Sequence, residues 1–289
     1  MNWDILVLAN LNRLLRVKAS DRKAVLALLL LVPAASLGIV MAVYVAPGRL
    51  GQVVFALTKG WLLLLPIGWI VWFERDRIQA IPTLNAAIDA IGQRFGHSPQ
   101  TRTEEDSMPL ASPMPVLNEV WQYLSRKWPQ PRELGTGIGL GVLMFATILA
   151  VWWFPGQYWI DAAAVQARAQ EVGIDRPIFL IGGALYWTVV NALLEEYVWR
   201  WFVYRQCRVL LPRVGAILLA ALCFTLHHSL ILIAYTNWPV TILGSTAVFL
   251  AGAIWSGCYL RYRSLWVGYI SHAFADLALA IVAWIILFG

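Results

Sequence analysis

Residues 24–46 read AVLALLLLVPAASLGIVMAVYVA, a continuous apolar run without one charged side chain. A helix needs about 20 such residues to cross the hydrocarbon core of a bilayer. Residues 52–73 and 264–288 are predominantly apolar runs of similar length. Runs of this kind cannot all form the core of one soluble domain, so the sequence predicts a polytopic integral membrane protein.

The composition agrees with a membrane location. Apolar residues make up 60% of the chain and charged residues only 13%, and the mean hydropathy is +0.66. These values lie well outside the usual range of soluble domains. The net charge of +6 comes from Arg and Lys in the loops that flank the apolar runs, not from one basic face. The pattern indicates a lipid bilayer as the partner and argues against nucleic acid.

The predicted fold class is all-α, a polytopic transmembrane helical bundle of about seven to eight spans. Seven spans can be placed, at residues 24–46, 52–73, 135–154, 178–203, 214–235, 239–260 and 264–288. Cytoplasmic loops are enriched in Lys and Arg, and Arg13, Arg16 and Lys18 precede the first span. We therefore expect a multi-pass protein of the plasma or inner membrane with a cytoplasmic N-terminus.

Three parts are expected along the chain. Residues 1–73 hold a basic amphipathic segment and two spans. Residues 74–134 form a cytoplasmic linker, with amphipathic helices at 80–95 and about 116–124. Residues 135–289 hold the other five spans.

Ionisable side chains inside lipid cost at least about 2.5 kcal/mol each, so they indicate function by default. We single out six inside the predicted spans: Glu195, Glu196, His227, His228, His272 and Asp276. At about 1.5 Å per helical residue, Glu195 lies about 20 Å from Arg208 and His228 about 22 Å from Arg213. Asp276 lies about 20 Å from Arg263. His272 lies at about 14 Å by the same count. The similar depth on three helices predicts that these side chains meet.

Helical spacing separates the two glutamates. Glu196 and Arg200 are four residues apart, which favours a structural ion pair. Glu195 lies about 100° around the helix from Glu196 and is free to face another helix. Three structural alternatives stay open: interhelical ties for both glutamates, a packing role for His227, and a local hydrogen bond between His272 and Asp276.

Three motifs in order resemble those of the CPBP family, the CAAX proteases and bacteriocin-processing proteins, of the CAAX prenyl protease 2 type. They are EEYVWR at 195–200, FTLHH at 224–228 and HAFAD at 272–276. The family patterns to which they are similar are EExxxR, FxxxH, and HxxxN or HxxxD. The resemblance covers about residues 175–289 and implies that the five-span part, residues 135–289, is a CPBP-type intramembrane protease core.

The resemblance implies an intramembrane endopeptidase, a hydrolase of peptide bonds. Glu195 with His228 would activate the attacking water. His272 and Asp276 would stand at the positions that stabilise the oxyanion. The other motif residues, Glu196, Arg200 and Phe224, would support the site. Because ionised Asp is only an acceptor, we expect Asp276 to orient His272; a protonated Asp276 is the alternative.

The sequence leaves open whether the site holds a metal ion. Glu195, His228 and His272 could ligate Zn²⁺ with a water, which would fit the label metalloprotease. The chain has no HExxH motif, however, and the ligands would come from separate helices. A metal-free mechanism without a cofactor is therefore favoured.

The expected partner is a peptide or a membrane-anchored protein substrate, whose identity the sequence does not specify. The alternative function is a non-catalytic membrane protein of the CPBP fold, such as a bacteriocin immunity or partner-binding protein. A proton-coupled transporter would also use buried carboxylates and histidines. It is disfavoured, because transporters are typically built from internal repeats and the sequence shows none.

Overall fold

The structure is a computed structural model that describes residues 19–73, 128–171, 173–174 and 176–289. Of these residues, 91% are helical and none lies in a strand. Seven helices in the described part are long and apolar enough to cross a membrane: Ser20–Val45, Arg49–Phe73, Pro131–Trp159, Pro177–Leu210, Arg213–Tyr235, Trp238–Tyr262 and Trp266–Phe288. The predicted all-α bundle with seven spans is confirmed. The amphipathic helices predicted at 80–95 and 116–124 lie outside the described residues, as does nearly all of the basic N-terminal segment.

Several spans combine α-helical and π-helical stretches. In chain order the elements are α2 (Ala19–Ile39), η1 (Val40–Val45), α3 (Arg49–Phe73), α7 (Pro131–Val151), η3 (Trp152–Gly156), α8 (Gln157–Trp159), α9 (Ala162–Glu171), α10 (Pro177–Leu185), η4 (Tyr186–Asn191), α11 (Ala192–Glu195), η5 (Glu196–Val203), α12 (Tyr204–Leu210), α13 (Arg213–Tyr235), α14 (Trp238–Tyr262) and α15 (Trp266–Phe288). The short helix α9, between the third and fourth spans, has no counterpart in the sequence prediction. The fourth span ends at Leu210 and not at 203, because the helix continues into the polar residues of α12.

Local signals set the helix ends. Pro131 occupies the start of α7, where its missing N–H removes no hydrogen bond. The side chain of Glu133 accepts a hydrogen bond from the backbone N–H of Gln130 at 2.9 Å, as in a capping box. Asn237 caps α14, since its Oδ1 accepts from the N–H of Val240 at 3.1 Å.

The contacts divide the chain into two compact units. The first comprises Met1–Leu63 and Pro129–Gly289, and the second comprises Leu64–Trp128. Every candidate site residue lies in the first unit.

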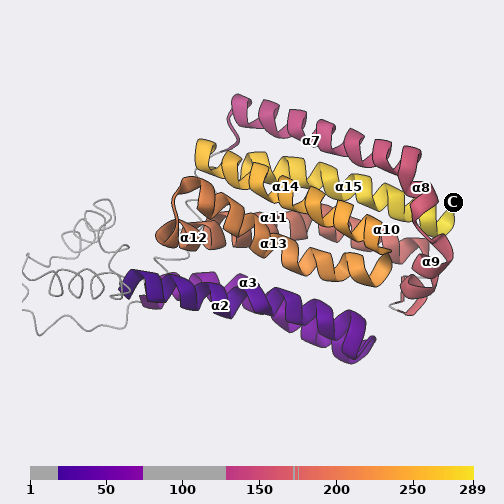
Figure 1. Cartoon of the computed structure of the whole chain (residues 1–289), viewed down its shortest axis with the longest axis horizontal. Helices are drawn as coiled ribbons and strands as arrows, with labels where there is room; N and C mark the ends of the chain where they lie inside the picture. Colours follow the sequence, from indigo (N-terminus) through magenta and orange to yellow (C-terminus); the bar gives the residue numbers. More distant parts are fainter. Residues whose placement is uncertain (1–18, 74–127, 172, 175) are drawn as a thin grey trace, which may run out of the picture. The chain divides into compact units, whose positions relative to one another are not determined.

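Within the first unit the C-terminal helices pack closely. α15 contacts α7 and α14, and α14 lies along α13 (Figure 1). A Cβ at Gly137 of α7 would come 3.1 Å from Ile270, and one at Gly141 would come 2.8 Å from the ring of Phe274. Small residues let helices approach in lipid without losing van der Waals contact. This packing fixes α15, which carries one of the three motifs.

Candidate active site

The fourth span is irregular where its two glutamates lie. One turn of α-helix, α11, separates the π-helical stretches η4 and η5, and Glu195 is its last residue. π-Helical stretches are rare and occur frequently at functional sites. Both carboxylates are buried, with Glu195 at 7% exposure and Glu196 at 1%. They face different partners, as the helical spacing predicts.

The two oxygens of Glu195 have different surroundings. Oε1 accepts a hydrogen bond from Nδ2 of Asn191 at 2.9 Å and lies 3.6 Å from Nζ of Lys59. Oε2 is buried and has no hydrogen-bond partner among the described residues. It lies 3.8 Å from Nε2 of His228 and 3.7 Å from Nε2 of His272. An unpaired buried carboxylate oxygen is costly, and polar atoms at such separations commonly share a water.

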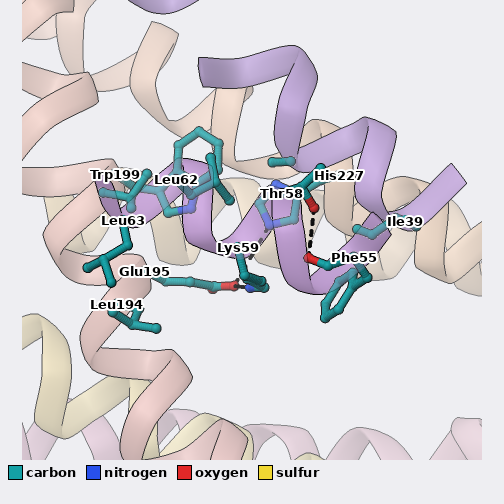
Figure 2. A pocket seen from close by; sticks show the side chains of 12 residues that line it. Ile39, Phe55, Thr58, Lys59, Leu62, Leu63, Leu194, Glu195, Trp199 and His227 are labelled. Carbon is teal, nitrogen blue, oxygen red and sulfur yellow. Dashed lines mark hydrogen bonds and ion pairs between the residues drawn. The ribbon is translucent and has the colours of Figure 1, made fainter. Parts of the chain in front are cut away.

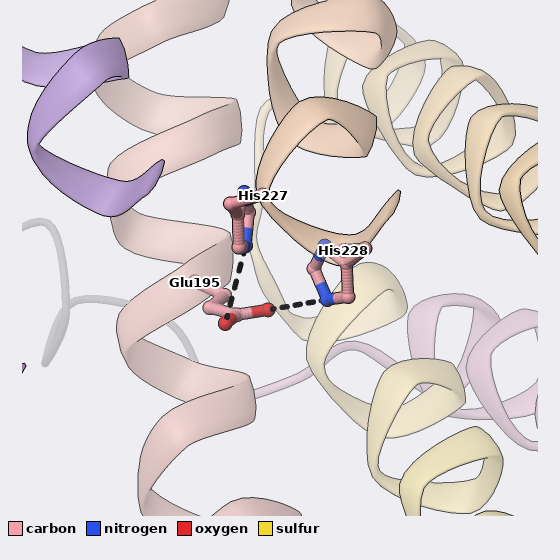
Figure 3. A group of neighbouring side chains, drawn as sticks. All are labelled: Glu195, His227 and His228. Atoms are coloured by element: carbon pink, nitrogen blue, oxygen red, sulfur yellow. Dashed lines mark ion pairs between the residues drawn. The ribbon is translucent and has the colours of Figure 1, made fainter. Parts of the chain in front are cut away.

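His228 comes from α13, next to His227 (Figure 3). Its Nδ1 lies 3.0 Å from the backbone oxygen of Phe224. A carbonyl oxygen only accepts, so Nδ1 carries the proton and donates to it. The Nε2 lone pair of the neutral ring is then directed toward Glu195 and can accept a hydrogen bond.

His272 of α15 is held from two sides. Its Nδ1 donates to Oε1 of Glu196 at 3.1 Å, and its ring stacks on Trp255, with centroids 4.3 Å apart. Nε2 lies 3.7 Å from Oδ1 of Asp276. The hydrogen bond that orients His272 therefore comes from Glu196, whereas the sequence-based expectation assigned this role to Asp276. The cause is the rotation of the fourth span relative to α15, which sequence spacing does not specify.

Glu196 and Arg200 form the predicted ion pair. Nη1 of Arg200 lies 3.3 Å from Oε1 of Glu196, and both side chains are 1% exposed. The guanidinium also lies over the rings of Phe224 and Trp255, at 4.4 and 4.8 Å from their centroids. Such cation–π contacts stabilise a desolvated Arg. The pair thus fixes the carboxylate that orients His272.

Replacing Gly268 with Ala should destabilise the protein. A Cβ at this position of α15 would collide with Oε2 of Glu196 and lie 2.9 Å from its Cδ. Glu196 cannot move aside without leaving Arg200 and His272, so the overpacking should cost about 1–3 kcal/mol. Thermal unfolding in detergent measures the effect.

The matched control is Gly257→Ala in α14. No described residue comes within 4 Å of a Cβ at Gly257. It should therefore keep or raise the unfolding midpoint, because Ala is favoured over Gly in a helix by about 1 kcal/mol. Equal effects of the two substitutions would contradict a close approach of α15 to Glu196.

His227 belongs to the same cluster and also packs. Its Nε2 lies 3.9 Å from Oε1 of Glu195, and its ring stacks on Trp199 with centroids 5.0 Å apart. Among the described residues, the group that could hold a metal ion is Glu195, His227 and His228, whose donor atoms lie within 4.8 Å of one another. The set expected from sequence has His272 in place of His227.

Two polar residues of the cluster are absent from the set predicted by sequence: Lys59 and Asn191. Lys59 lies inside the second predicted span, 52–73, so the rule that singled out the other charged residues applies to it as well. Asn191 is uncharged, and only its position four residues before Glu195 could have indicated it.

Fold and site together define a multi-pass membrane protein with a buried carboxylate surrounded by imidazoles from two other helices. Residues 177–278 match the family model described as type II CAAX prenyl endopeptidase Rce1-like. All three motifs lie within these residues, so this part of the chain is similar to the CAAX proteases and bacteriocin-processing proteins. This similarity supports a protease of the CAAX type, but it does not support the label metalloprotease. No curated protein and no solved structure matches the chain.

Proposed function

We propose that the chain is an intramembrane endopeptidase in which Glu195 and His228 activate the attacking water. The observation that carries the proposal is the unpaired Oε2 of Glu195, which lies between Nε2 of His228 and Nε2 of His272 at 3.8 and 3.7 Å. A water beside Oε2 can donate one proton to Glu195 and the other to the Nε2 lone pair of His228. The protease core is assigned to residues 135–289, with a membrane-embedded or membrane-anchored protein as substrate.

The reaction needs a base, an oxyanion donor and a route for one proton. Glu195 takes a proton from the water as the water oxygen attacks the carbonyl carbon of the peptide. The carbonyl oxygen becomes negative and accepts a hydrogen bond from Nε2–H of His272 when this ring is protonated on both nitrogens. Glu196 and Asp276 are the carboxylates that balance that charge. The C–N bond then breaks as Glu195 passes its proton to the leaving amine.

His272 is an effective oxyanion donor only if it is held in place before the reaction. The Glu196 hydrogen bond and the Trp255 stack provide this preorganisation. A fixed donor in a site without bulk water stabilises developing charge far more than a mobile one. Asp276 contributes a second negative charge near Nε2 but, when ionised, no donor.

The residues around Glu195 do not fit a resident metal ion well. One carboxylate and two imidazoles form a common zinc ligand set, and Glu195, His227 and His228 provide one. The Lys59 ammonium, however, lies 3.6 Å from Oε1 of Glu195 and would repel a divalent cation there. The same carboxylate therefore already has a positive partner, and no step is assigned to a metal.

Chelation should leave proteolysis unchanged. Because the water is activated by Glu195 and His228, cleavage by the purified protein is expected to remain within about twofold after treatment with EDTA or 1,10-phenanthroline and gel filtration. Elemental analysis should find far less than one zinc per chain. Loss of cleavage on chelation, restored by added zinc, would contradict the metal-free mechanism.

The proposed function is tested by comparing membranes that contain the wild type with membranes that contain His228→Ala. Mass spectrometry of membrane peptides should find cleavage products that depend on the wild-type protein. His228→Ala should insert and fold but yield none of them. Identical peptide sets, with both proteins present at equal levels, would instead favour a non-catalytic member of the fold.

A further inference from the structure

We infer that Lys59 and Asn191 are positioning residues for Glu195, so that helix α3 of the N-terminal pair of spans completes the reaction centre. Nζ of Lys59 donates to Oδ1 of Asn191 at 2.6 Å, across 132 residues of chain. Nδ2 of Asn191 donates to Oε1 of Glu195 at 2.9 Å. The three side chains form one directional hydrogen-bond chain that ends on the carboxylate. This inference rests on the proposed role of Glu195 as the base.

The position of Lys59 in α3 is itself informative. It lies about 15 Å along the helix from Arg49, within an 18-residue stretch of the helix whose mean hydropathy is 1.8. A lysine near the centre of such a helix is costly unless it is paired. Glu195 is the anionic partner, with Nζ 3.6 Å from Oε1. Phe55, one turn earlier, adds a ring 5.5 Å from the ammonium.

The two charges lie in mainly apolar surroundings. Lys59, Glu195 and His227 line a cavity of about 30 Å³ whose other walls are mainly apolar side chains of α2, α3, α11 and η5 (Figure 2). The attraction between the charges is therefore screened much less than at a protein surface.

The arrangement assigns the two oxygens of Glu195 to separate tasks. Lys59 and Asn191 both act on Oε1, which leaves Oε2 free toward His228 and His272. Fixing one oxygen restricts the rotation of the carboxylate, so the other remains directed at the water. Lys59 and Asn191 touch neither substrate nor water in this scheme.

The first experiment measures charge coupling without any substrate. Thermal unfolding of the purified protein in detergent is recorded for Lys59→Met, Glu195→Gln and the double variant. Lys59→Met should lower the midpoint by at least about 2–4 °C, because a buried carboxylate loses its cation. The double variant should melt higher than Lys59→Met alone. If the midpoint shifts of the two single variants simply add up in the double variant, the inference is overturned, whatever the activity of the protein.

The second experiment separates positioning from folding. Against a peptide that the wild type cleaves, Lys59→Met and Asn191→Leu should each lower kcat at least about tenfold with little change in KM. Lys59→Arg, which keeps the positive charge, should retain most of the wild-type kcat. Arg49→Met, which removes an exposed cation from the same helix, is the matched control and should act like the wild type. Wild-type kcat in Lys59→Met would overturn the inference. If the wild type cleaves no peptide, the proposed function fails, and the unfolding experiment still decides whether Lys59 is coupled to Glu195.

Discussion

Glu195→Gln is expected to reduce peptide-bond hydrolysis by between about 10² and 10⁴-fold, the usual contribution of a general base. Gln has the same shape, and its amide oxygen can still accept from Asn191 Nδ2, so the hydrogen bond at 2.9 Å can persist. What is lost is the oxygen that takes the proton of the water. The measurement is the single-turnover rate of the purified protein on a membrane peptide, with the variant confirmed as folded by its thermal transition.

The control is Glu171→Gln in α9. Glu171 is an exposed carboxylate paired with Arg168 at 2.7 Å, outside the cluster, and its replacement should leave the rate unchanged. Retained proteolysis in purified Glu195→Gln protein would rule out Glu195 as the base. It would direct attention to Asp276, the other carboxylate within reach of His272 Nε2.

Arg200→Met is expected to lower the free energy of unfolding by about 3–5 kcal/mol, the usual cost of breaking a buried ion pair. Glu196 is only 1% exposed, so its carboxylate would be left buried without a cation. The orientation of His272 depends on the same carboxylate, so activity should also fall. Chemical or thermal unfolding in detergent measures the loss of stability.

A second substitution distinguishes the loss of charge from the loss of packing. Glu196→Gln removes the unpaired charge and keeps an oxygen that can accept from His272 Nδ1. Added to Arg200→Met, it should recover a large part of the lost stability, since removing both members of a buried pair is often nearly neutral. Arg168→Met, in an exposed pair of the same residue types, should cost at most about 1 kcal/mol. Equal losses of unfolding free energy in Arg200→Met and Arg168→Met would contradict a buried ion pair at Arg200.

Much of the fold could be predicted from sequence because the signal is local. A run such as 24–46 is long and apolar enough to span a bilayer wherever it occurs in a chain. The seven spans follow on that basis, and the structure differs from them only in where each span begins and ends. The extension to Leu210 and the helix α9 were missed because polar residues past a span end neither require nor forbid further helix.

The site was predictable in part. Charged and imidazole side chains are rare in lipid, so Glu195, His228, His272 and Asp276 could be selected from the sequence. Helix rise alone gives Glu195, His228 and Asp276 a similar depth and places His272 about one turn shallower. The structure brings His228 and His272 to within 3.8 Å of Glu195, and Asp276 to within 3.7 Å of His272. Depth along a helix follows from counting residues, but rotation about its axis does not. The partner of His272 Nδ1 therefore turned out to be Glu196.

The apolar run at 24–46 and its counterparts determine by themselves that this is a multi-pass membrane protein, because span length and hydropathy are properties of single segments. Pairing between segments is decided only when the helices pack. Lys59 and Asn191 are 132 residues apart and meet at 2.6 Å because α3 and the fourth span lie together with these faces inward. Only the tertiary structure shows that the second span places a positive charge beside the carboxylate of the fourth.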